Sequence, residues 1–359
     1  NDALVAEARR KELEYFTSKG VWRKRLLSEA FAKTGRRPIS VRWVDVNKGD
    51  EQNPRYRSRL VARQLKATDH SGKCYFAPTP PLEALRTVLS FAASRVGNWR
   101  PCYDPKSEKR MQISCLDISR AYFNAKLDGG AKTFVQLPPE DPDAGVLCAE
   151  LLRHMYGTRA AADGWREEYS STLVSELEFI QGVASLCLFR HSSRAIVVSV
   201  HGDDFTAAGS KTDLDWYESE MKKHYELTTQ PRLGPAPQDG KEAVVLNRII
   251  RWCDHGLEYE ADPRQVEKLL AECGLTGANP VATPGQRLSF NEVEKDNDLE
   301  QFRVAAFRGA AARANYLAAD RIDCQFAAKE ICRWMSKPTE NSWNALKRLC
   351  RYLAGLPRL

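Results

Sequence analysis

The sequence has no apolar stretch long enough to cross a lipid bilayer, and its first residues, NDALVAEARRKELEYF, lack the apolar core of a signal peptide. It contains ten cysteines and six histidines but no C-x-x-C and no H-x-x-x-H. Cysteines spaced singly along a chain favour buried thiols in a reducing compartment over a zinc site or a disulfide framework. We therefore expect an intracellular protein without a membrane partner and without structural zinc.

The chain is long enough for more than one core. It has 359 residues, of which 43% are hydrophobic and 28% charged, and it shows no internal repeat. Its net charge of +7 is unevenly spread, because residues 1–75 carry 18 Lys and Arg against 9 Asp and Glu, and residues 321–359 carry 8 against 3. Two basic ends would suit a polyanion held from two sides, and an ordinary solvated surface explains the same counts equally well.

The hydrophobic spacing predicts mixed strands and helices first and mostly helices later, with a boundary near residue 255. In RYRSRLVARQLK, alternation places Arg55, Arg57 and Arg59 on one face of a strand. The spacing of Trp165, Tyr169, Leu173 and Leu177 predicts a helix over 163–177 whose aromatic side chains pack in the core. Further helices are expected over 1–34, from about 82, from about 213, and over 304–335 and 340–354. A helix is also expected over DPRQVEKLLAECG, where Asp and Pro mark the start and Gly marks the end. Strands are expected at 39–46, 111–117, 195–200 and 244–252.

Two adjacent carboxylates, Asp203 and Asp204, occupy the tip of the predicted hairpin AIVVSVHGDDFTAAG. Gly and Asp are common turn residues, so a plain hairpin turn is one explanation. Asp117 ends a second apolar strand, MQISCLD, and adjacent placement of the two elements in one sheet would bring three carboxylates together. Such a cluster is destabilising unless divalent cations neutralise it, and two Mg²⁺ ions about 4 Å apart activate a 3′-hydroxyl and stabilise a leaving pyrophosphate.

The order of motifs resembles the reverse transcriptase of copia-type (Ty1/copia) LTR retrotransposons. RYRSRLVARQLK resembles the fingers motif, CLDISRAYFNAKL the first palm motif, HMYGTRAAADGWREEY the segment before the catalytic hairpin, and VHGDDF the Tyr-x-Asp-Asp motif. LNRIIRW, NPVATP, RANYLAADRIDCQFAAKEICRWMSKPT and WNALKRLCRYLAG follow in the order found in that family. The resemblance covers roughly residues 38–359.

The resemblance implies a role for specific residues. Asp117, Asp203 and Asp204 would hold the metal ions, with the backbone carbonyl of Ile118 as a further ligand. Arg57 and Arg59 would meet the triphosphate of the incoming nucleotide. Tyr122 would stack under the nucleotide sugar and exclude a 2′-hydroxyl, and a core tyrosine is the alternative explanation. The residues that would contact the primer or template are His201, Gly202, Asn247, Arg248 and Arg251.

The fold that the resemblance implies is an α+β right-hand polymerase with fingers, palm and thumb, an antiparallel palm sheet with packed helices, and a helical C-terminal region. Its expected parts are an N-terminal helical lead-in at 1–37, fingers and palm at 38–255, and a thumb-like region at 256–359 that tracks a nucleic-acid duplex. No second acidic cluster suits RNase H or integrase chemistry, so those domains and the protease are expected elsewhere in a longer Pol polyprotein.

The implied partners are an RNA template, a DNA or RNA primer and deoxynucleoside triphosphates, and the implied cofactor is a pair of Mg²⁺ ions, with Mn²⁺ as an alternative. The implied location is a cytoplasmic virus-like particle or the nucleus. Two departures from the family stand out: His201-Gly202 occupies the start of the catalytic turn, and Ala160-Ala161-Ala162 replaces Gln-x-Pro. They leave open a catalytically weakened relic that only binds nucleic acid, and a metal-dependent phosphohydrolase is a third alternative.

Overall fold

The computed structural model describes residues 2–68, 73–94, 100–127, 130, 132–287, 289, 291 and 295–358. The chain divides into two compact units, Asn1–Ala236 and Pro237–Leu359, called here the N-terminal and C-terminal units. This division precedes the expected boundary near residue 255, because residues 242–260 form a three-stranded sheet of their own. Each unit has its own hydrophobic cluster, so each is described separately.

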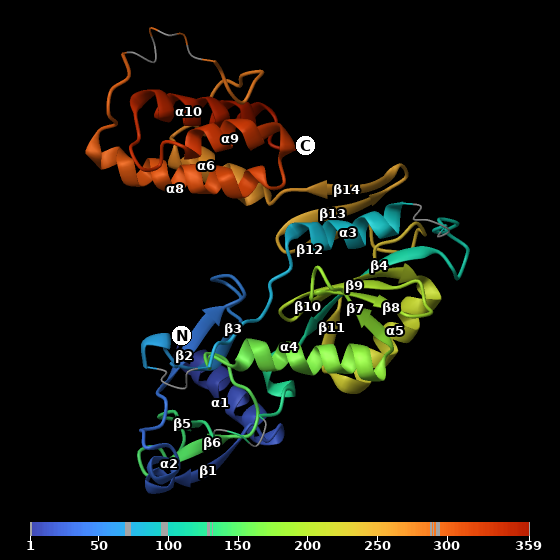
Figure 1. The fold of residues 1–359 in the computed structure, drawn as a ribbon, viewed down its shortest axis with the longest axis vertical. Helices are drawn as coiled ribbons and strands as arrows, with labels where there is room; N and C mark the ends of the chain where they lie inside the picture. Colours follow the sequence, from blue (N-terminus) through green and yellow to red (C-terminus); the bar gives the residue numbers. More distant parts are fainter. Residues whose placement is uncertain are drawn as a thin grey trace. The chain divides into compact units, whose positions relative to one another are not determined.

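The N-terminal unit is an α+β structure whose main component is an antiparallel six-stranded sheet of order β11-β4-β10-β9-β8-β7 (Figure 1). Its helical segments are α1 (Asp2–Ser18), α2 (Leu27–Thr34), η1 (Lys66–Thr68), α3 (Leu82–Ala93), η2 (Ala121–Asn124), α4 (Ala161–Ser171), η3 (Thr172–Glu176) and α5 (Lys211–His224). Its strands are β1 (Trp22–Leu26), β2 (Val41–Asn47), β3 (Tyr56–Ala62), β4 (Met111–Ile118), β5 (Phe134–Gln136), β6 (Leu147–Leu151), β7 (Phe179–Gln181), β8 (Leu188–His191), β9 (Val197–His201), β10 (Asp204–Ser210) and β11 (Leu227–Thr229).

Helices cover both faces of this six-stranded sheet, because alternate residues of its central strands are buried on opposite sides. On β10, Phe205 and Ala207 belong to the cluster that includes the apolar side chains of α4 and α5. Thr206 and Ala208 point to the other face and are also buried, on the side where α3 packs. The helix expected over 163–177 is confirmed as α4 continued by one π-helical turn, and its four predicted core residues are all buried.

The expectation of continuous helix over residues 1–34 is wrong, because residues 22–26 form strand β1. This strand pairs with β6 in a three-stranded sheet of order β1-β6-β5. Arg23 and Arg25 both donate to the buried carboxylate of Glu150, at 2.7 and 3.0 Å, which favours the strand over a helical turn. Residues 2–34 therefore pack as part of the N-terminal unit, and helix α1 lies against β3.

The C-terminal unit begins with the sheet β12-β13-β14 and continues as a helical bundle (Figure 1). Its elements are β12 (Glu242–Val245), β13 (Arg248–Cys253), β14 (Gly256–Glu260), α6 (Pro263–Glu272), α8 (Gln301–Ala318), η4 (Ile322–Cys324), α9 (Gln325–Cys332) and α10 (Glu340–Gly355). Helix α6 starts as predicted, because the side chain of Asp262 accepts a hydrogen bond from the backbone N–H of Arg264 and Pro263 follows the cap. The stretch expected as one helix over 304–335 is divided by η4 into α8 and α9.

Residues 244–252, expected as a single strand, form a hairpin. Leu246 and Asn247 make its two-residue turn, and both adopt positive φ angles, 49° and 66°. Two consecutive residues with positive φ form the turn whose twist matches that of an antiparallel pair. Asparagine tolerates this conformation, but leucine adopts it rarely. The apolar stretch VVLNRIIRW therefore gives no clear turn signal, and the sequence predicted one continuous strand.

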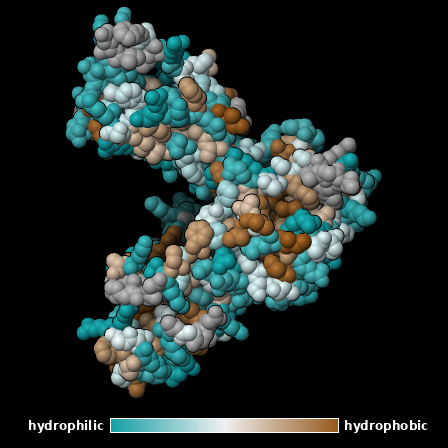
Figure 2. All heavy atoms as spheres, in the orientation of Figure 1, coloured by the Kyte–Doolittle hydropathy of each residue, from teal (hydrophilic) through white to brown (hydrophobic). Residues whose placement is uncertain are grey.

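The visible surface is mainly hydrophilic, and apolar residues gather mostly over the N-terminal unit, in the region of β8–β10 (Figure 2). Among the described residues, no helix combines the length and apolarity needed to cross a membrane.

Candidate active site

The three predicted acidic residues come together at one edge of the six-stranded sheet. Asp204, the first residue of β10, lies directly opposite Asp117 near the end of β4. Asp203 occupies the turn before β10, and its carbonyl oxygen accepts a hydrogen bond of 2.9 Å from the backbone N–H of Ile118. The strand register therefore assembles the carboxylates that the sequence places 86 and 87 residues apart.

The turn that carries Asp203 is tight and anchored. His201 pairs with Asp204, so Gly202 and Asp203 form a two-residue loop, and Gly202 has a φ of +67°. Glycine at the first position of such a loop permits this conformation without strain. The indole N–H of the buried Trp165, on α4, donates to the carbonyl oxygen of Gly202 at 2.8 Å. The spacing of apolar residues predicted only that Trp165 packs in the core. It could not predict the hydrogen bond to Gly202, because periodicity shows which face of a helix is buried but not which distant residue lies against it.

The negative charges of Asp117, Asp203 and Asp204 repel one another. Partial removal from water and the charges of Asp203 and Asp117 raise the pKa of Asp204 to about 6. Desolvation and the charge of Asp203 also raise the pKa of Asp117, while Arg57 and Arg59 oppose this rise. Asp117 and Asp204 nevertheless remain exposed on one side. Carboxylates are the oxygen donors that a hard divalent cation prefers, so the chemistry of the residues present fits such an ion. The ligand oxygens of the three side chains do not all lie within 4.8 Å of one another, so binding an ion would require them to move closer together.

Strand β3 brings its arginines close to the acidic cluster. The backbone N–H of Ala62 donates to the carbonyl oxygen of Tyr156 at 2.8 Å, which ties β3 to the segment before α4. A side chain at Gly157 would collide with the Ala62 carbonyl, since an added Cβ would lie 2.0 Å from that oxygen. The charges of Arg57 and Arg59 both reach Asp117. The two cationic side chains are therefore near enough to act on the charge of Asp117, and their contact with a nucleotide stays a prediction.

Tyr156 is a candidate site residue that the sequence reasoning missed. Its ring lies 4.6 Å from that of Tyr122, and the guanidinium of Arg59 lies over it at 4.8 Å. The hydroxyl of Tyr156 and Nε of Arg59 are buried, and neither has a hydrogen-bond partner among the described residues. Desolvation is the main cause that raises the pKa of Tyr122 and of Tyr156, and the charge of Asp203 acts in the same direction on both. The only sequence signal was its position in HMYGT, inside a segment already assigned to the site.

Helix α1 contributes a buried acid to the same region. Glu12 is 3% exposed and accepts a hydrogen bond from Nε of Arg120 at 3.0 Å. Burial raises its pKa, and the charges of Arg120, Arg59 and Arg57 counteract that rise. The helix expected as a lead-in thus balances the charge of the arginines on β3.

The predicted primer and template residues fall in two places. His201 and Gly202 lie at the acidic turn, whereas Asn247, Arg248 and Arg251 belong to the β12–β13 hairpin of the C-terminal unit. Arg248 is 5% exposed and forms an ion pair of 2.9 Å with Asp320, so its guanidinium is occupied within the unit. Arg251 pairs with Glu242 and Glu260 across its own sheet. Asn247 is exposed at the turn.

Ala160, Ala161 and Ala162 open helix α4, with Ala160 as a cap that offers no side-chain hydrogen bond. The departure from Gln-x-Pro therefore removes a polar side chain at the start of the helix whose Trp165 supports the acidic turn.

Comparisons with known proteins agree with this geometry. A family model described as reverse transcriptase (RNA-dependent DNA polymerase) matches residues 31–287. The retrovirus-related Pol polyproteins from transposon RE2 of Arabidopsis thaliana and transposon TNT 1-94 of Nicotiana tabacum are 27% and 23% identical over 331 and 339 residues. Each match covers 89% of this chain, which spans only 20% and 23% of the respective polyprotein.

A solved structure has a similar fold. The foamy viral protease-reverse transcriptase dRH in complex with ds DNA matches with a TM-score of 0.50 and 10% sequence identity. The match covers 98% of this chain and 48% of that one.

Proposed function

The chain belongs to the reverse transcriptase family, and from its relation to copia-type Pol polyproteins we propose that it is an RNA-directed DNA polymerase that extends a primer on an RNA or DNA template. The observation that carries the proposal is the register that sets Asp204 opposite Asp117 with Asp203 in the adjoining turn. The primer 3′-oxygen attacks the α-phosphate of a deoxynucleoside triphosphate, a phosphodiester bond forms, and pyrophosphate leaves.

Asp117, Asp203 and Asp204 hold two Mg²⁺ ions in this proposal, with the backbone carbonyl of Ile118 as a further ligand and Mn²⁺ as a substitute. The ions supply activation of the primer hydroxyl and charge stabilisation of the leaving pyrophosphate. The carboxylates orient the ions. The pKa values of Asp117 and Asp204 are raised in part by neighbouring carboxylates, and bound cations would offset this repulsion, which supports the proposal.

The nucleotide lies, in our proposal, between the acidic turn and strand β3. Arg57 and Arg59 bind the triphosphate oxygens, for which a planar cationic fork is well suited. Tyr122 lies under the sugar and excludes a 2′-hydroxyl. Tyr156 supports the ring of Tyr122 and holds Arg59 in place by stacking, which the contacts of 4.6 and 4.8 Å support.

We assign His201 and Gly202, in the N-terminal unit, to contact with the primer end, and separately the exposed turn at Asn247, in the C-terminal unit, to contact with the primer or template. We assign Arg248 and Arg251 a supporting role in that hairpin, since both guanidinium groups already have carboxylate partners. The chain acts, in this proposal, within a longer Pol polyprotein whose protease, integrase and RNase H work is done by other segments, in a cytoplasmic virus-like particle or the nucleus.

The test is extension of a labelled DNA primer on an RNA template with Mg²⁺ and four deoxynucleotides. We expect product from the wild type and from Glu14→Gln, which neutralises an exposed carboxylate on α1. We expect at least about a 10³-fold loss in Asp203→Asn, because electrostatic stabilisation of the transferring group usually contributes more to the rate of such chemistry than any other effect.

Equal activity in Asp203→Asn would disprove the role of the acidic turn. Folded wild-type protein that binds the primer-template but gives no product with either Mg²⁺ or Mn²⁺ would identify a nucleic-acid-binding relic. Release of phosphate from nucleotides without a template would identify a phosphohydrolase.

A further inference from the structure

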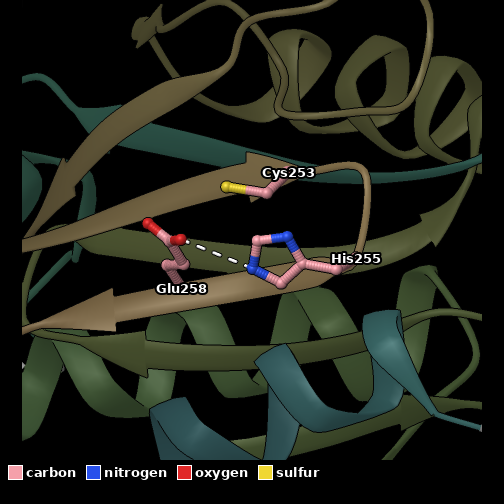
Figure 3. A group of neighbouring side chains, drawn as sticks. All are labelled: Cys253, His255 and Glu258. Carbon is pink, nitrogen blue, oxygen red and sulfur yellow. Dashed lines mark ion pairs between the residues drawn. The ribbon is translucent and has the colours of Figure 1, made fainter.

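Three side chains with metal-binding atoms meet at the β13–β14 turn, outside the site described above (Figure 3). One ligand atom each from Cys253, His255 and Glu258 lies within 4.8 Å of the other two. This is the one group of three or more such side chains that the described part of the chain brings together in this way. It combines sulfur, nitrogen and oxygen donors, whereas the acidic turn offers carboxylates alone.

The hairpin geometry explains why these side chains converge. Cys253 pairs with Gly256, and Glu258 lies two residues further along β14, so both side chains lie on the same face of the hairpin. Gly256 has no side chain, and a Cβ built there would meet no atom within 4 Å, which leaves space beside Cys253. His255 belongs to the turn, and its ring points back along the hairpin toward Glu258 (Figure 3).

The donor atoms suit a tetrahedral transition-metal ion. An imidazole nitrogen and a carboxylate oxygen about 2.0–2.2 Å from zinc are separated by roughly 3.4 Å when the geometry is tetrahedral. Nε2 of His255 and Oε1 of Glu258 are 3.4 Å apart. A bond to sulfur is longer, about 2.3 Å, so the tetrahedral separation of the sulfur from the other two donors is roughly 3.6 Å. All three donor atoms lie within 4.8 Å of one another, so a small side-chain movement suffices to reach this geometry.

We propose that Cys253, His255 and Glu258 bind one divalent transition-metal ion of the zinc type, with water as the fourth ligand. Binding displaces the thiol proton of Cys253 to solvent, because the thiolate is the ligand. The ion replaces the His255–Glu258 ion pair and joins both strands of the hairpin to its turn.

The proposed site differs from the polymerase metals in ligand type and location. A set with thiolate and imidazole selects zinc-type ions, whereas carboxylate and carbonyl oxygens select Mg²⁺. It also belongs to the C-terminal unit, whereas the acidic turn belongs to the N-terminal unit. The metal site therefore does not depend on the proposed polymerase activity.

The test is a titration of the full chain with Co²⁺, which reports thiolate ligation by an intense near-ultraviolet charge-transfer band. We expect one equivalent of tetrahedral Co²⁺, its displacement by Zn²⁺, and no thiolate band in Cys253→Ser. Removal of His255 or Glu258 by His255→Gln or Glu258→Gln should weaken binding by about 10- to 100-fold or more. Ions bound to the acidic turn give no thiolate band, so they do not interfere.

Two controls make the outcome decisive. Cys74→Ser removes an exposed cysteine elsewhere and should leave the band unchanged. His255 is mostly exposed, so His255→Gln should fold normally and should show a smaller Zn²⁺-dependent rise in melting temperature than the rise we expect of the wild type. No thiolate band in the wild type, the same band in Cys253→Ser, or an unchanged Co²⁺ affinity in His255→Gln would overturn the proposal.

Discussion

At the scale of the residue, Asp204 shows how the site depends on its neighbours. Its carboxyl group faces Asp117 across the strand pair, and its pKa rises from an ordinary 3.8 to about 6. The folded protein therefore holds this proton more tightly than the unfolded chain does. Stability consequently falls as the pH rises from about 4 to about 6, and the whole loss is present above that range.

We predict that Asp204→Asn stabilises the metal-free protein at pH 7.5, because it removes the repulsion. The expected gain is on the order of 1 kcal/mol, less than the full pKa shift implies, since water screens an exposed carboxylate. Melting temperatures without metal should differ at pH 7.5 and converge below about pH 4. Mg²⁺ should raise the melting temperature of the wild type at pH 7.5 more than that of the variant, and an equal rise would contradict the assignment of Asp204 as a ligand.

At the scale of the element, the β12–β13 hairpin combines strain with exposure. Leu246 has a φ of 49°, a conformation that costs a residue with a side chain about 1–2 kcal/mol. The buried Arg248 donates to the carbonyl oxygen of Leu246 at 2.7 Å and pairs with Asp320, so the turn is held in place from within the unit. Strained turns that are firmly supported are common at functional sites.

We predict that Leu246→Gly raises the stability of the protein by about 0.5–1 kcal/mol, because glycine adopts positive φ without strain. If the turn contacts the primer, the same variant should weaken primer-template binding. Chemical denaturation and a binding titration measure the two effects separately. The matched control is Asn247→Gly, which retains a residue suited to positive φ and should change stability less. Lower stability in Leu246→Gly would show that packing of the leucine outweighs the strain.

At the scale of the whole molecule, the chain divides into two units between Ala236 and Pro237. The largest cluster of the N-terminal unit lies between the six-stranded sheet and helices α4 and α5, a second cluster there includes Phe16 and Leu60, and the cluster of the C-terminal unit joins α6, α8, α9 and α10. Proteins with separate units often unfold in more than one step.

We predict that Leu346→Ala, in the core of the C-terminal unit, destabilises that unit by about 2–5 kcal/mol through loss of buried contacts and an added cavity. Val198→Ala, in the other core, should act on the N-terminal unit. Calorimetry should show each variant lowering a different transition, whereas Phe326→Ala, which removes an exposed side chain, should change neither by much. A single transition lowered equally by both core variants would show that the units unfold together.

Local patterns in the sequence were enough to predict several of the main helices and strands. The four-residue spacing of Trp165, Tyr169, Leu173 and Leu177 predicted a helix and its buried face, and Asp262-Pro263 predicted where α6 begins. Such predictions succeed because side-chain direction, capping and backbone preference act within a few residues. The acidic residues were also selected from sequence, because Asp117 ends the apolar stretch MQISCLD and Asp203-Asp204 occupy the tip of an apolar hairpin.

Only the tertiary structure decided which of these parts meet. Strand β1 depends on Glu150 far along the chain, and the hydrogen bond from Trp165 to the acidic turn joins a helix to a loop. Tyr156 lies next to Tyr122, 34 residues earlier in the chain, only through loop packing. Register and packing are set by contacts between distant residues, whose free energy no single stretch of sequence contains. For that reason the sequence could predict that the three acids meet, but only the fold shows the register that places Asp204 opposite Asp117.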